Sequence, residues 1–181
     1  MDKLKQAAKF FLAALIAAQV LFPVYMIVSN EITLAKGNDY LFRVAPYDPY
    51  DPFRGRYVTV RIMDNEAEVK QNFNRDDTAY AELITSGGHA QILSLTAQRP
   101  AVSGYVKVKI KGVSTEKNIK TARVEYPFDR LFMNEKIAPL VDKAFRGYKG
   151  QVYLQVAIKD GQATPKKLFF DGVEASEYVK K

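Results

Sequence analysis

The sequence of 181 residues contains no cysteine, no tryptophan and one histidine. The absence of cysteine excludes disulfides, thiolate catalysis, iron–sulfur clusters and cysteine-based zinc sites. The single histidine, His89, excludes a histidine-rich metal site and lies in a Gly-Gly-His turn, where we expect an exposed ring. Walker phosphate loops, dinucleotide-binding fingerprints and H-E-x-x-H helices are also missing from the sequence. We therefore expect a non-catalytic protein without a metal or a cofactor.

Charge is missing from one long stretch. The 19 residues from Phe10 to Val28 carry no charged side chain, and about 20 apolar residues are enough for a helix to cross the core of a bilayer. Three lysines precede this stretch and favour a cytoplasmic N-terminus. We predict a cytoplasmic tail and transmembrane signal anchor over residues 1–30, in a cell membrane, followed by a periplasmic or extracellular part over residues 31–181.

Two other interpretations of the apolar stretch stay open. A cleaved signal peptide would have a shorter apolar region and an A-x-A-like cleavage site. Residues 17–19 match such a site only faintly, and the apolar run continues beyond them. A buried core helix would show a polar face every 3.6 residues, whereas the only polar groups here are Gln19 and the Tyr25 hydroxyl.

The excess of positive charge is spread along the chain. The formal net charge is +7, but Lys107, Lys109 and Lys111 alternate with aliphatic residues, as on the exposed face of a strand. This pattern does not indicate a nucleic-acid groove, so we expect no nucleic-acid partner and keep the membrane lipid bilayer as a partner. The roughly 150 residues after the predicted anchor suffice for one domain or two small ones.

Alternation of apolar and polar residues predicts a mostly β fold after the anchor. Residues 29–45 are expected to form a first strand or a linker, and residues 66–77 a loop or short helix. Residues 134–146 have apolar side chains at helical spacing. The predicted fold is a β-sandwich or barrel-like domain with one amphipathic helix, preceded by a single N-terminal transmembrane helix. The predicted strands cover residues 55–62, 79–84, 89–98, 104–112, 150–158 and 166–170.

A stiff acidic block precedes the first clear strand. Prolines at every third position, from Pro46 to Pro52, exclude a helix. Asp48, Asp51 and Arg54 lie at three-residue spacing in the same block. The two carboxylates are suited to pair with the guanidinium group or to bind a hard cation such as Ca²⁺. The alternative is structural, because aspartate before proline often caps a turn of its own backbone.

Aromatic residues are frequent, with 11 tyrosines and 11 phenylalanines. Most of them are expected in the core of a sheet. Aromatic side chains on a proline-stiffened backbone lose little entropy on binding, which suits recognition of a partner. The candidates for a partner surface are Tyr47, Tyr50, Phe53, Phe128 and Phe132.

Residues 48–62 read DPYDPFRGRYVTVRI and resemble the signature of the GDYXXLXY family of bacterial proteins. Residues 126–135 and 160–172 are similar to later segments of that family. Gly55 and Tyr57 match the name-giving motif and are therefore candidate binding residues beside the acidic block.

Three positions depart from the name-giving motif. Arg56 stands where the family has aspartate, Val60 where it has leucine, and Ile62 where it has tyrosine. Valine for leucine is a mild change in a strand, whereas arginine for aspartate reverses a charge. Arg56 therefore cannot supply any function of the family that depends on the carboxylate of this aspartate.

The resemblance implies an envelope protein, because members of the family usually carry one N-terminal membrane segment and accompany polytopic membrane proteins. It supplies no activity. We therefore expect a non-catalytic accessory subunit or interaction partner of a polytopic membrane protein. The alternative, which rests on the residues themselves, is a periplasmic or extracellular module that binds a small ligand or cation around Asp48, Asp51 and Arg54.

Overall fold

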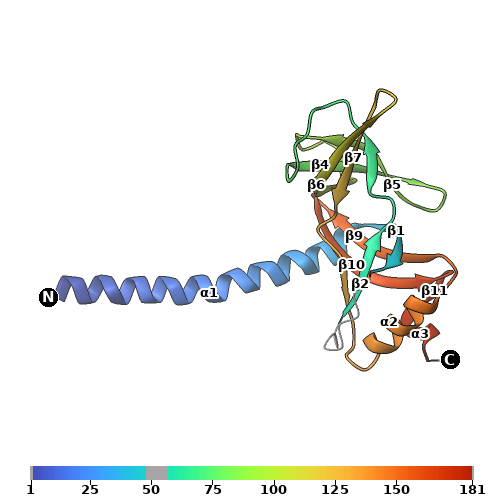
Figure 1. Cartoon of the computed structure of the whole chain (residues 1–181). Coiled ribbons are helices and arrows are strands. Elements are labelled where there is room, and N and C mark those ends of the chain that lie inside the picture. Colours follow the sequence, from blue (N-terminus) through green and yellow to red (C-terminus); the bar gives the residue numbers. More distant parts are fainter. Residues whose placement is uncertain (1, 48–56, 181) are drawn as a thin grey trace.

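A computed structural model of the chain describes residues 2–47 and 57–180. It begins with one long helix, α1 (Asp2–Lys36), which projects away from the rest of the protein (Figure 1). The large apolar side chains from Phe10 to Val28 are 49% to 73% exposed. The helix is long and apolar enough to cross a membrane, and its apolar window is not packed inside the protein. The interpretation as a buried core helix is therefore wrong.

The first of two antiparallel sheets has six strands in the order β11-β10-β9-β1-β2-β8. It pairs strands from both ends of the described chain, since β1 lies between β2 and β9. The strands are β1 (Asn38–Pro46), β2 (Tyr57–Ile62), β8 (Arg130–Phe132), β9 (Val152–Lys159), β10 (Gln162–Phe170) and β11 (Val173–Glu174).

The second sheet has five strands in the order β3-β7-β6-β4-β5 and comes from one continuous segment between β2 and β8. Both sheets are strongly curled, as Figure 1 shows, so the predicted mostly β fold with an N-terminal apolar helix is confirmed. The strands are β3 (Glu66–Glu68), β4 (Thr78–Ser86), β5 (His89–Thr96), β6 (Tyr105–Glu116) and β7 (Ile119–Glu125).

One apolar core runs through both sheets. Phe42 on β1 belongs to this core and is completely buried. The ring of Phe42 meets Tyr126 and Phe128 edge to face, with centroids 5.3 Å and 5.2 Å apart. Edge-to-face pairs place a positive ring edge on a negative ring face, which adds to the gain from burial. The segment that leaves β7 is thereby fixed against the six-stranded sheet.

Two helices lie near the C-terminal end of the chain. The first, α2 (Ala138–Gly147), buries Ala138, Val141 and Phe145 and begins four residues later than predicted. Pro139 lies in its first turn, where the missing N–H is tolerated. The short helix α3 (Ala175–Tyr178) was not predicted from the sequence.

The junction between α1 and β1 corrects the prediction for residues 29–45. The helix continues through Lys36, and the strand begins only at Asn38. Gly37 joins the two, and its N–H donates to the Thr33 carbonyl at 2.9 Å. A Cβ atom at this position would lie 2.5 Å from that carbonyl oxygen and 3.0 Å from the Ile158 carbonyl oxygen. Only glycine fits here without displacing the backbone.

Candidate functional site

The acidic block falls outside the described residues. This applies to Asp48, Tyr50, Asp51, Phe53, Arg54 and Gly55, so the cation site predicted there stays a prediction. Tyr57 opens β2 directly after the block and is half-buried. Its ring lies 5.6 Å from the ring of Phe132 and 5.1 Å from the guanidinium carbon of Arg130. Tyr57 is therefore held by an aromatic and a cation–π contact with β8.

The residues predicted to form a partner surface separate into two groups. Phe132 is 70% exposed on β8, an edge strand of its sheet, and Tyr47 is 48% exposed at the end of β1. Phe128 is 6% exposed and packs on Phe42 in the core. Phe128 is therefore a core residue and contributes nothing to an exposed surface, whereas Phe132 and Tyr47 are accessible to a partner.

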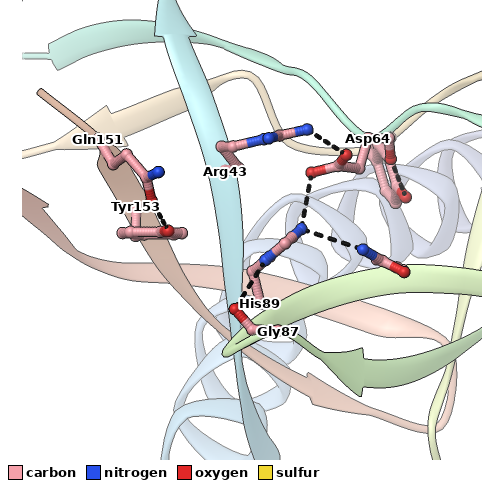
Figure 2. Close-up of polar contacts among 8 residues, drawn as sticks. Arg43, Asp64, Gly87, His89, Gln151 and Tyr153 are labelled. Atoms are coloured by element: carbon pink, nitrogen blue, oxygen red, sulfur yellow. Dashed lines mark hydrogen bonds and ion pairs between the residues drawn. The ribbon is translucent and has the colours of Figure 1, made fainter. Parts of the chain in front are cut away.

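A polar cluster that the sequence did not predict lies where the two sheets meet (Figure 2). Asp64, between β2 and β3, accepts a hydrogen bond from the Arg43 guanidinium on β1 at 2.8 Å. Its backbone carbonyl accepts a hydrogen bond from the Tyr126 hydroxyl at 3.1 Å. The second carboxylate oxygen, Oδ2, faces His89 Nε2 on β5 at 3.6 Å. The cluster thus links strands of the six-stranded sheet to a hairpin of the five-stranded one.

His89 is less exposed than predicted, because the cluster covers it. Its side chain is 13% exposed. Nδ1 lies 3.3 Å from the Gly87 carbonyl oxygen, and Nε2 lies 3.2 Å from the Gln91 amide nitrogen. A neutral ring with its proton on Nδ1 satisfies both contacts, since Nδ1–H donates and Nε2 accepts. In that state Asp64 Oδ2, which is buried, receives no hydrogen bond from the described residues.

The charges and hydrogen bonds of the cluster indicate that it holds the two sheets together. Burial, followed by the nearby charge of Asp64, raises the pKa of Tyr126 above that of an ordinary phenol. Tyr126 therefore remains a neutral hydrogen-bond donor over the physiological pH range. The Arg43 guanidinium donates a hydrogen bond to the Asp64 carboxylate, and His89 Nε2 lies 3.6 Å from the second oxygen of the same group. Within the described ranges, no group of three or more side chains is arranged to hold a metal ion.

A pocket of about 240 Å³ lies beside this cluster, between β2 and β7. Tyr47, Asn65 and Tyr126 are among its lining residues. Tyr47 is also the last described residue before the acidic block. The pocket combines aromatic rings with the charged side chains of Arg61 and Asp129, so it has the mixture of apolar and polar groups that small-ligand sites use.

The family model described as GDYXXLXY protein matches residues 19–168, which span α1 from its middle, the five-stranded sheet, most of the six-stranded sheet and the polar cluster. The chain belongs to the GDYXXLXY family. The resemblance seen in the acidic block and in the later segments is therefore confirmed. No curated protein and no solved structure matches this GDYXXLXY protein.

Proposed function

We propose that this GDYXXLXY protein is a single-pass membrane protein with a cytoplasmic N-terminus and its β-rich body on the periplasmic or extracellular side. In this proposal the body is a non-catalytic accessory subunit or interaction partner of a polytopic membrane protein. The observation that carries the proposal is the exposed apolar helix that continues without a break into the body.

The dimensions of α1 support membrane insertion. The uncharged residues from Phe10 to Val28 extend over about 28 Å at 1.5 Å per residue, close to the ~30 Å of a bilayer core. Their side chains are exposed, so burial in lipid is the only way to remove this apolar surface from water other than contact with another protein. The three lysines before this stretch favour retention of the N-terminus in the cytoplasm.

The joint between helix and body supports a role beside another membrane protein. The Ser29 hydroxyl donates to Gln162 Oε1 at 2.7 Å, and the buried Thr33 hydroxyl lies 3.3 Å from the same oxygen. Together with Gly37, these contacts leave no flexible linker between α1 and β1. The body is thereby held at a fixed height, where a polytopic partner would contact both the helix and the body.

Affinity purification from mild-detergent membranes tests the proposal. The full chain is compared with a variant in which residues 10–28 are replaced by polyleucine and with one that lacks residues 1–30. We expect a polytopic membrane protein to co-purify stoichiometrically with the full chain and to be lost when residues 1–30 are removed. Mass spectrometry of the bait should find Met1 or Asp2 at its N-terminus. A bait trimmed near Ala18 and free of partners would contradict the proposal and favour a released domain.

The second candidate function is binding of a small ligand or cation by the body. The pocket of about 240 Å³ next to Tyr47 favours it, because the acidic block follows Tyr47 directly. Thermal unfolding of the full chain in detergent, with and without Ca²⁺, tests this function. A ligand that binds only the folded state raises the melting temperature. An Asp48→Asn/Asp51→Asn variant should lose that increase, and an unchanged melting temperature in the unsubstituted chain would exclude the cation.

A further inference from the structure

A polar pocket of about 230 Å³ lies at the joint between α1 and the body. One wall is formed by α1, and the other by the turn between β9 and β10. The residues that line it are Ser29, Ile32, Thr33, Lys159, Asp160 and Gln162. The proposed function leaves this pocket without a role.

The β9–β10 turn holds its part of the pocket in a fixed geometry. Asp160 and Gly161 both have positive φ values, 52° and 84°, as the two central residues of a type I′ hairpin turn require. Lys159 and Gln162 are the paired residues that flank this turn. A side chain at Gly161 would lie 2.8 Å from the Tyr105 ring, so the turn also packs closely on β6. Its polar groups are therefore preorganised.

The pocket presents opposite charges side by side. The Lys159 ammonium contacts the Asp160 carboxylate, which also receives the Arg99 guanidinium at 3.4 Å. The contact with Lys159, more than that with Arg99, holds the pKa of Asp160 below its usual range, so the carboxylate stays ionised in mildly acidic solution. The side chains of Arg99 and Asp160 are 61% and 58% exposed and that of Lys159 is 35% exposed, so all three can exchange partners with a ligand.

The second wall adds uncharged polar groups and a partial negative charge. Ser29 donates to Gln162 Oε1, and no described residue accepts from the amide nitrogen of Gln162. This amide therefore has two N–H donors left for a ligand. The C-terminal end of a helix carries a partial negative charge that favours cations. Ile32 contributes an apolar side chain that is 43% exposed.

The position of the pocket along α1 defines the environment it meets. Ser29 directly follows the apolar stretch from Phe10 to Val28, and Thr33 lies one turn later. The pocket wall thus covers about 6 Å of helix directly beyond the hydrocarbon core. The headgroup layer of a bilayer is of the same thickness, roughly 5–8 Å on each side. If α1 spans the membrane as proposed, the pocket opens at the level of the lipid headgroups.

We propose that this pocket binds the headgroup of a phospholipid that carries a primary amine, of the phosphatidylethanolamine type. The phosphate accepts hydrogen bonds from Lys159, Arg99 and the Gln162 amide, and the ammonium group donates to Asp160 near the C-terminal end of α1. The acyl chains extend along the apolar surface of α1. This inference rests on the proposed membrane insertion and adds a specific lipid partner to it.

Native mass spectrometry of the full chain in detergent tests the inference. Phosphatidylethanolamine, phosphatidylglycerol and phosphatidylcholine with identical acyl chains are added separately, and inorganic phosphate is added as a competitor. We expect phosphatidylethanolamine to bind at least about tenfold more tightly than phosphatidylcholine, whose quaternary ammonium cannot donate a hydrogen bond. Millimolar inorganic phosphate should not displace it, because phosphate lacks the amine and the acyl chains.

The critical variant is Lys159→Ala/Asp160→Asn. Asparagine tolerates the left-handed backbone conformation of position 160, so the turn is retained. The matched control is Lys167→Ala/Glu174→Gln, which removes another lysine–carboxylate pair, between β10 and β11, away from the pocket. We expect the first variant to lose the roughly tenfold preference for phosphatidylethanolamine and the control to keep it.

Three results would overturn the inference: equal binding of the three lipids, a preference that persists in the critical variant, or displacement by inorganic phosphate alone. Extraction of membranes with alkaline carbonate tests membrane insertion of the full chain independently of its lipid preference. A chain that resists extraction but shows no lipid preference refutes the headgroup site alone. A chain that is extracted refutes membrane insertion and the headgroup site with it.

Discussion

Replacement of Gly37 by alanine tests the rigid joint between α1 and the body. The added Cβ atom would lie 2.5 Å from the Thr33 carbonyl oxygen, about 0.9 Å closer than the 3.4 Å at which ordinary contact begins. Its next neighbours are the carbonyl oxygen and the nitrogen of Ile158, at 3.0 Å and 3.1 Å. All three atoms belong to the backbone, so no side chain can rotate to make space.

The expected cost follows from this lack of space. Overpacking a close contact typically costs about 1–3 kcal/mol, which corresponds to a decrease in melting temperature of roughly 3–10 °C for a chain of this size. The matched control is Gly147→Ala at the end of α2, where a Cβ atom would meet no other atom within 4 Å. We expect the control to be neutral or more stable by about 0.5–1 kcal/mol, because alanine favours a helix.

The assay is thermal unfolding of the full chain in detergent, followed by tyrosine fluorescence, together with limited proteolysis near residue 37. Gly37→Ala should unfold at a lower temperature and be cut faster at the joint than the unsubstituted chain. Equal melting temperatures for Gly37→Ala and Gly147→Ala, with equal cleavage rates, would refute the reasoning that close backbone approach fixes the joint.

Three further predictions concern the body of the protein and use the same unfolding assay. Phe42→Ala removes the buried ring between two aromatic neighbours and should cost about 3–5 kcal/mol, whereas a loss below about 1 kcal/mol would contradict its tight packing in the core. The pKa of Tyr126 is raised above the ordinary phenol value of 10.0, so its contribution to stability is fully present below that pH and is lost as the pH rises further. Between about pH 9.5 and about pH 11, the Tyr126→Phe variant should therefore lose less stability than the unsubstituted chain. The hydrogen bond from Lys167 lowers the pKa of Glu174, so the contribution of this carboxylate to stability is present above pH 4.5 and is lost as the pH falls through the lowered value. Glu174→Gln should therefore make the free energy of unfolding depend less on pH in acidic solution. An unchanged dependence on pH would count against this pair.

The long elements of the fold could be predicted because their patterns repeat over many residues. The uncharged stretch from Phe10 to Val28 predicted the exposed part of α1, and regular alternation predicted β2, β6 and β9. The strands β3, β8 and β11 have three, three and two residues. A period of two cannot be recognised over so few positions, so pairing with a neighbouring strand, rather than local sequence, defines them.

The polar cluster could not be predicted from the sequence for a related reason. Arg43, Asp64 and His89 are separated by more than 20 residues along the chain and form no motif. They meet only because the segment between β2 and β8 folds into its own sheet and returns its β4–β5 hairpin to β1. The glycines before His89 predicted a turn correctly but gave no information about what would pack on it.

Because α1 continues directly into β1, the length of the helix determines how the body is rotated about the helix axis. Each residue of an α-helix advances by about 1.5 Å and turns by about 100°. For a chain embedded through α1, one residue inserted between Val28 and Ser29 would therefore change the direction in which the whole body faces far more than its height. An insertion of seven residues would restore the facing direction to within about 20° and raise the body by about 10 Å. In a chain embedded in this way, the length of α1 would therefore determine the direction in which both sheets face around the membrane normal.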